Sequence, residues 1–157
     1  DWSEVGGTAG TINVINREAG SGTRATFEAA VLQGAEVPAD FTPVAEVDSS
    51  GTVVEQVAAT EGSISYVAFN YYETNEGIKA LSVDGVEPTQ ENVESGDFNI
   101  WAYEHMYTVA EPDEATQAFI DYMMSDEVQS SLVEAQGYIP VSGMKVEKDA
   151  DGNVTTL

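Results

Sequence analysis

The spacing of apolar residues near the start of the chain predicts a strand followed directly by a helix. Residues 11–15 place Ile12 and Val14 on one side and end at Ile15, which is typical of a buried strand. Residues 23–32 carry apolar side chains at helical intervals, and Gly34 follows as the expected C-terminal stop. The side chains predicted to face inward from this helix are Phe27, Ala30 and Val31.

A second strand and helix are predicted immediately afterwards. Residues 44–47 are a short strand candidate, and Asp48-Ser49-Ser50-Gly51 is predicted to open a helix. Thr52 and Glu55 have the spacing of a capping box. Residues 63–69 then alternate like a strand. The side chains predicted to face the core from this helix are Val53, Val54, Val57 and Ala58.

The second half of the chain is predicted to contain turns, one long strand and further helices. The Asp-Gly pair at 84–85 predicts a tight hairpin turn, and residues 98–109 form an aromatic-rich strand candidate. This succession of short strands and helices favours an α/β layer architecture. Helical segments are expected at 89–94, 113–124 and 126–136, with Ser125 as an N-cap, Gly96 and Gly137 as stops, and a tail hairpin around Asp151-Gly152.

Composition limits the classes of function. The 157 residues include 28 acidic and 5 basic side chains, a net charge of −23, which disfavours nucleic acid and anionic membranes as partners. Apolar residues make up 42% of the chain, enough for a globular core, so the acidity indicates a highly soluble surface. There is no cysteine for disulfides or thiolate metal sites, and no apolar run long enough to span a membrane.

Candidate chemistry lies between the first predicted strand and helix, in Arg17-x-x-Gly20-Ser21-Gly22-Thr23. The first N–H groups of a helix lack internal partners and carry the positive end of its dipole. Glycine lets the backbone approach a ligand, Ser21 and Thr23 add hydroxyl donors, and Arg17 adds a charged fork. This combination predicts an oxyanion pocket in which Arg17, Gly20, Ser21, Gly22 and Thr23 bind the ligand.

Pattern alone leaves one structural alternative open. The same residues are compatible with a glycine-rich turn that Ser21 merely caps, with Arg17 on the surface. A nucleotide P-loop is excluded because its glycine spacing and its Lys-Ser or Lys-Thr pair are both missing. A dinucleotide fingerprint also fails, since no third glycine follows Gly20-x-Gly22 at the required offset.

At this point the chain resembles the phosphate-binding proteins of ABC importers. The Arg-x-x-Gly-Ser-Gly-Thr element is the specific part, and the remaining matches follow the order of that family up to about residue 141. The matching stretches are residues 2–7, 12–24, 27–28, 62–67, 80–89, 92–96, 119–120, 125–129 and 137–141.

The resemblance implies a type II periplasmic-binding-protein fold, in which two α/β lobes clasp one phosphate. This chain would supply one lobe, a mixed sheet flanked by helices, plus returning C-terminal helices. The implied divisions are a second-lobe ligand-binding portion at 1–104, a hinge strand and C-terminal helices at 105–141, and an exposed tail hairpin at 142–157. The implied function is extracytoplasmic phosphate binding for delivery to ABC permease subunits, without catalysis, cofactor or metal.

The resemblance also shows two departures. Some family members place an acidic residue two positions after the arginine, to accept the proton of hydrogen phosphate, where this chain has Ala19. The chain begins at Asp1 without an initiator Met, so we expect a removed leader or a longer protein with a lipid anchor and a first lobe upstream. An isolated second lobe is expected to self-associate through Phe119, Ile120 and Leu132.

Other features point away from catalysis. His105 is the only histidine and has no evident nucleophile beside it, so a structural role is favoured. Residues 149–153 resemble the start of a calcium loop but lack its glycine spacing and closing glutamate, which favours a solvated turn. The aromatic residues at 66–72 are interpreted as packing residues. Sulfate-like ligands, a non-transport phosphate sensor or structural module, and a phosphatase remain the alternatives to phosphate transport.

Overall fold

The computed structural model describes residues 1–157, which form two compact units, Asp1–Leu81 and Ser82–Leu157. Helices and short strands occur in both units, so the predicted α/β class is confirmed. None of the helices combines the length and the apolar character needed to cross a membrane.

The first unit is built on a three-stranded parallel sheet with the order β2-β1-β3. Its strands are β1 (Asn13–Arg17), β2 (Ala45–Val47) and β3 (Ser63–Ile64). In place of one mixed sheet, the chain has this all-parallel sheet and a separate antiparallel hairpin. The three strands are parallel because a helix after each of the first two strands returns the chain to the edge where that strand began. Successive strands therefore run in the same direction.

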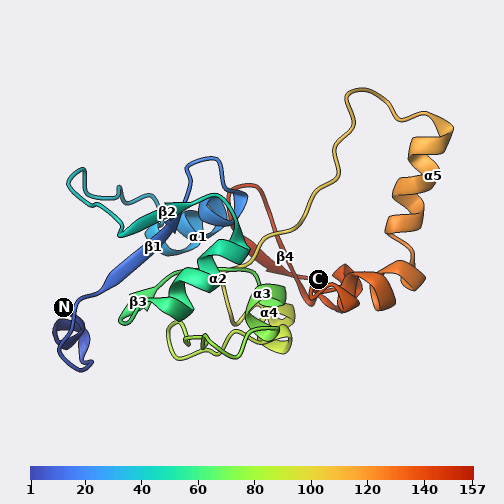
Figure 1. Cartoon of the computed structure of the whole chain (residues 1–157). Helices are drawn as coiled ribbons and strands as arrows, with labels where there is room; N and C mark the ends of the chain where they lie inside the picture. Colours follow the sequence, from blue (N-terminus) through green and yellow to red (C-terminus); the bar gives the residue numbers. More distant parts are fainter. The chain divides into compact units, whose positions relative to one another are not determined.

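Both helices of the first unit begin at the carboxyl edge of the sheet. Helix α1 (Gly22–Leu32) follows β1, and α2 (Ser50–Ala59) follows β2. In Figure 1, α2 lies in front of the three strands and α1 lies behind them. The two crossovers run to opposite sides of β1, and ligands of open α/β sheets bind at such a switch point, outside the carboxyl ends of the strands.

The core of the first unit is centred on Ile15, in the middle of β1. Ile15 is fully buried at 0% exposure, and it packs with Val47 and Val53. The predicted inward positions Val31 and Ala58 are wrong, because both side chains are exposed. Each lies in the last turn of its helix, where strands this short offer little surface to cover it.

Two local predictions for this unit are corrected. The cap of α2 is Ser49, whose hydroxyl accepts from the Thr52 N–H at 3.2 Å, so Thr52 and Glu55 do not form the capping box. The strand predicted at 63–69 ends at Ile64, and helix α3 (Phe69–Glu73) begins soon after. Pairing stops because the Ser65 hydroxyl, in place of a backbone N–H, donates to the Ile15 carbonyl at 2.6 Å.

The second unit confirms most of its predicted elements. Asp84 and Gly85 have φ values of 53° and 83° in the turn that joins the Val83–Val86 bridge. Ser125 accepts from the Val128 N–H, as predicted for an N-cap. The elements are α4 (Gln90–Ser95), α5 (Glu114–Met123), a π-helical segment Val128–Val133, β4 (Val146–Lys148) and β5 (Val154–Thr156), with 3-10 turns at Trp2–Val5 in the first unit and Val141–Gly143 here.

The long strand predicted at 98–109 is wrong, because no neighbouring strand pairs with it. A strand needs a partner for its N–H and C=O groups, and here a lysine supplies part of that bonding. Lys148 Nζ donates to the carbonyls of Asn99 and Trp101 and lies 4.2 Å from the Trp101 ring centroid. Burial lowers the pKa of Lys148. His105 is exposed within a row of rings formed with Tyr103 and Tyr107.

The tail forms the predicted antiparallel hairpin, and Asp149 organises its turn. One Asp149 oxygen accepts from the N–H groups of Asp151 and Asn153, and the other accepts from the Asn153 side chain. These bonds lower the pKa of Asp149, with the Asn153 side chain as the largest cause. The interpretation of this segment as a hairpin turn is confirmed, although β4 also buries Val146.

We expect Gly62→Ala to lower the stability of the first unit by about 2 kcal/mol, because L side chains are strained at positive φ. Gly62 has φ +70°, and an added Cβ would lie 2.6 Å from the Thr11 carbonyl oxygen. Its own carbonyl accepts from Trp2 Nε1 at 2.9 Å, so the Trp2 indole signal reports the loss during urea denaturation. Gly10→Ala is the matched control, since open space surrounds Gly10. Equal stabilities of the two variants would contradict the strain.

Candidate oxyanion site at the carboxyl edge of the sheet

The predicted binding residues cluster where β1 passes into α1. Arg17 is the last residue of β1, Ser21 is the N-cap of α1, and Gly22 and Thr23 form its first turn. Because α2 begins at the same edge, its first turn also faces this position. The sequence segment therefore folds into a compact cradle supported by the start of a second helix.

Arg17 is buried at 8% exposure, which contradicts the alternative that left it on the surface. Its Nη1 donates to the Ser50 hydroxyl and its Nη2 to the Asp48 carbonyl, both at 2.9 Å. Its Nε is buried and has no hydrogen-bond partner. The protein therefore holds a cationic side chain at the cradle without using all of its donors.

Ser21 and the first turn of α1 supply further donors. Ser21 is 6% exposed, and its hydroxyl oxygen accepts from the Arg24 N–H at 3.2 Å. No protein acceptor bonds the N–H groups of Gly22 and Thr23. These two amides lie at the positive end of an 11-residue helix, where an anion is stabilised.

The two glycines of the motif are not needed for their backbone angles. Neither Gly20 nor Gly22 has positive φ, so the turn itself does not require glycine at either position. An added Cβ at either residue would meet no atom within 4 Å. Side chains are absent from these positions next to open space, so a ligand can approach the backbone directly.

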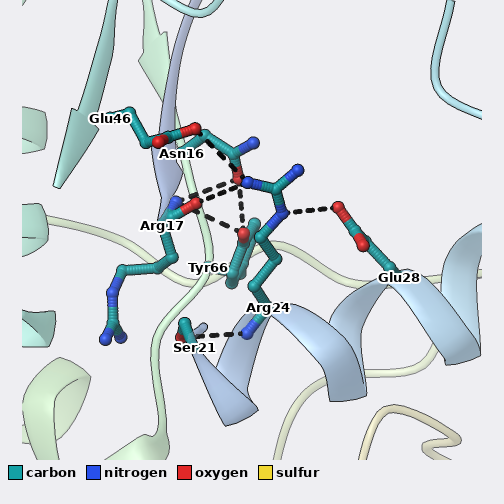
Figure 2. A network of polar contacts seen from close by, with 7 residues as sticks. All are labelled: Asn16, Arg17, Ser21, Arg24, Glu28, Glu46 and Tyr66. Atoms are coloured by element: carbon teal, nitrogen blue, oxygen red, sulfur yellow. Dashed lines mark hydrogen bonds and ion pairs between the residues drawn. The ribbon is translucent and has the colours of Figure 1, made fainter. Parts of the chain in front are cut away.

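A polar network locks the backbone behind the cradle (Figure 2). Arg24 Nη1 donates to the Arg17 carbonyl at 2.9 Å, and its guanidinium forms ion pairs with Glu28 at 2.7 Å and Glu46 at 3.3 Å. The hydrogen bond to Glu28 is the largest cause of a raised pKa at Arg24. In Figure 2 the Arg17 guanidinium points away from this network, so the two arginines serve different surroundings.

Tyr66 completes the network from β3's side of the sheet. Its ring stacks on Phe27 with centroids 4.2 Å apart, and its hydroxyl bonds the Asn16 side chain at 2.5 Å. The Arg17 N–H donates to the same hydroxyl oxygen at 3.4 Å. Burial is the largest cause of a raised pKa at Tyr66. The packing role predicted for Tyr66 is confirmed. Its hydrogen bonds to Asn16 and Arg17 were not predicted from the sequence.

We expect Tyr66→Phe to flatten the loss of stability at alkaline pH. The folded state holds the Tyr66 proton more tightly than the unfolded chain, whose pKa is about 10, so stability falls as pH rises from about 10 through the folded pKa. Removing the hydroxyl removes this pH-dependent loss of stability. Urea denaturation below and above pH 10 measures it, with exposed Tyr107→Phe as the control. Parallel pH curves for wild type and Tyr66→Phe would count against it.

The sequence did not identify four residues that contact or support the site, namely Asn16, Asp48, Ser50 and Tyr66. The available signal is topological: Asp48 and Ser50 directly follow β2, and Tyr66 follows β3. Both strands are parallel neighbours of β1, so residues after their carboxyl ends gather at one edge. A search of the residues after the strand predicted at 44–47 finds Asp48 and Ser50, whereas the strand predicted at 63–69 contains Tyr66 and conceals its role.

The arrangement is suited to holding an oxyanion rather than to covalent chemistry. The Arg17 guanidinium, the Thr23 hydroxyl and two free amides are hydrogen-bond donors. The net charge of −23 does not forbid this, because distant acids are screened over about 8 Å at physiological salt whereas these donors act at about 3 Å. Geometry at the cradle therefore decides binding.

Comparison with known proteins finds relatives that cover most of the chain. The chain is 46% identical to the phosphate-binding protein PstS of Bacillus subtilis over 152 residues, covering 97% of this chain and 49% of that protein. It is 32% identical to PstS 2 of Streptococcus agalactiae over 143 residues, 87% of this chain and 48% of that protein. The chain thus spans about half the length of the curated relatives it matches.

Solved structures of phosphate-binding proteins are also similar to this chain. A Clostridium perfringens structure, described as a phosphate ABC transporter substrate-binding protein with bound phosphate, matches with a TM-score of 0.75 and 32% identity over 90% of this chain and 56% of that one. PstS of Borrelia burgdorferi matches with a TM-score of 0.64 and 29% identity, over 89% and 57% of the two chains. The model of the PBP superfamily domain matches residues 1–127. The chain belongs to the PBP superfamily.

Proposed function

We propose that the chain binds inorganic phosphate as part of a solute-binding protein that serves an ABC importer. The observation that carries the proposal is Arg17, a buried cation with a partnerless Nε at the end of β1, which the free amides of Gly22 and Thr23 follow at the start of α1. A buried charge with spare donors is costly unless a ligand satisfies it. The names of the relatives, one of them solved with bound phosphate, favour phosphate as that ligand.

Ligand binding in this chain involves Arg17, Gly20, Ser21, Gly22 and Thr23 and no covalent step. Gly20 and Gly22 leave room for the ligand, Ser21 shapes the first turn, and the other groups donate hydrogen bonds. The related substrate-binding proteins act in transport, which supports a role as a binding module rather than an enzyme.

The proposal extends to the wider setting of the protein. We place the protein outside the cytoplasm, held at the cell surface by a lipid anchor, with phosphate passed to permease subunits. The 1–104, 105–141 and 142–157 divisions describe this chain's share of a two-lobed clasp, with the first lobe supplied by another segment. The exposed apolar side chains Tyr107, Phe119 and Leu132 support a covering partner, either that lobe or a second copy.

Sulfate is the competing ligand, because the identified groups are donors and Ala19 replaces the proton acceptor of some relatives. Isothermal calorimetry of the chain with phosphate and with sulfate, at matched ionic strength, separates the two. We expect binding of phosphate at least about tenfold tighter than of sulfate, a difference of about 1.4 kcal/mol. Sulfate binding without phosphate binding would overturn the choice of ligand, and binding of neither would overturn the function.

A further inference from the structure

The two arginines of the chain lie seven residues apart in sequence, and only one of them has carboxylate partners. Arg24 is paired with the carboxylates of Glu28 and Glu46. Arg17 takes part in none of the ion pairs of the chain, and its two hydrogen bonds go to a hydroxyl and a peptide carbonyl. Its charge is therefore fixed in place without being neutralised.

The Ser50 hydroxyl has no other structural duty in the opening turn of α2. The N-cap of this helix is Ser49, whose hydroxyl bonds the Thr52 N–H and the Thr52 hydroxyl. Ser50 is the first helical residue, and its hydroxyl accepts a hydrogen bond from Arg17 Nη1 at 2.9 Å. Capping and arginine holding are thus divided between neighbouring serines, which makes them separable by substitution.

The hold leaves Arg17 with unused donors. A guanidinium has five N–H donors, and Ser50 and the Asp48 carbonyl take one from each terminal nitrogen. The remaining donors include the buried Nε–H, which no protein group accepts. An acceptor oxygen arriving at the cradle relieves this deficit, whereas a carboxylate partner inside the protein would already have done so.

We infer that Ser50 is a positioning residue for anion binding, which holds the Arg17 guanidinium with a neutral contact so that its full charge serves the ligand. The inference rests on the proposed function. The contact comes from the first turn of α2, so the arginine is fixed from the neighbouring strand connection.

The test is a phosphate titration of the 157-residue chain followed by its arginine Nε–H signals in ¹H–¹⁵N NMR spectra. The chain has only two such signals, and Arg24, bonded through Nε to Glu28, is the internal reference. We expect phosphate to shift the Arg17 signal together with the Gly22 and Thr23 amides. Chloride at the same ionic strength should leave them in place.

Three variants isolate the role of Ser50. Ser50→Ala should weaken phosphate binding about tenfold and move the Arg17 Nε–H signal in the free chain, because the guanidinium loses one of its two contacts. Ser50→Thr keeps the hydroxyl and should bind within about threefold of wild type. Ser49→Ala removes the helix cap and lowers stability by loss of the Thr52 contact, but it should also bind within about threefold.

The outcomes separate the two claims. If wild type shows no phosphate-dependent shift at Arg17, Gly22 or Thr23, the proposed function falls and this inference falls with it. If wild type binds phosphate but Ser50→Ala binds equally well, only the inference falls. The same holds if Ser49→Ala weakens binding as much as Ser50→Ala, since fraying of α2 would then explain both.

Discussion

Replacing Arg17 with alanine should reduce phosphate affinity between roughly 30-fold and several thousand-fold. Truncating one partner of a desolvated, hydrogen-bonded charge pair costs about 2–5 kcal/mol, and each 1.4 kcal/mol is a factor of ten. Arg17 meets these conditions because it is 8% exposed and unpaired with any carboxylate. Calorimetry, or NMR titration where binding is weak, measures the loss.

Two companion variants show whether charge or geometry is responsible. Lys79→Ala removes one positive charge from an exposed position and should leave affinity unchanged, because distant charges are screened. Arg17→Lys keeps the charge but loses the planar fork, and it should recover only part of the affinity. Equal affinities for Arg17→Ala and Lys79→Ala would show that Arg17 does not contact the ligand.

Ile15→Ala should lower the unfolding free energy of the first unit by about 2–5 kcal/mol. Ile15 is fully buried in the central strand and packs against Val47 and Val53, so truncation leaves a cavity that neighbouring strands cannot close. Domains are stable by only about 5–15 kcal/mol, which makes this a large fraction of the total. Urea denaturation followed by the Trp2 indole signal reports on this unit, and Trp101 reports on the other.

Val31→Ala provides the matched control, because it also truncates an aliphatic residue. Val31 is 44% exposed in the last turn of α1, so we expect a change within about 0.5 kcal/mol. A loss at Val31 as large as that at Ile15 would restore the wider helix face predicted from the sequence and contradict the packing described for this unit.

Local sequence signals were sufficient to predict the cradle. Arg17, Ser21 and the first turn of α1 lie within one continuous segment, so their neighbourhood depends on a single strand–turn–helix transition. Capping preferences and the pause in apolar periodicity at the glycines locate that transition. The same kind of signal placed Ser125 correctly as a cap in the second unit.

Contacts across the sheet edge could not be predicted in the same way. The Ser50–Arg17 and Tyr66–Asn16 bonds join residues 33 and 50 positions apart, and they form because β2 and β3 flank β1 in parallel. Strand order is a tertiary property that periodicity does not contain. Without it, Ser50 is only a residue at the start of a helix, and Tyr66 only an apolar ring.

The segment at 98–109 shows the opposite error, a local pattern without the tertiary partner it needs. Alternating aromatic residues have high strand propensity, but propensity in sheets mainly reflects packing against neighbours. Here Trp101 packs with Tyr103 and Lys148 instead of with an adjacent strand. The aromatic-rich composition was recognised from the sequence, but no neighbouring strand pairs with this segment.

The most direct test of the phosphate cradle is a crystal structure of the chain grown with phosphate. We predict a phosphate ion within hydrogen-bond distance of the Arg17 guanidinium and of the Gly22 and Thr23 amides, with Ser50 still bonded to Arg17. Phosphate bound elsewhere, with the Arg17 cradle empty, would contradict the account.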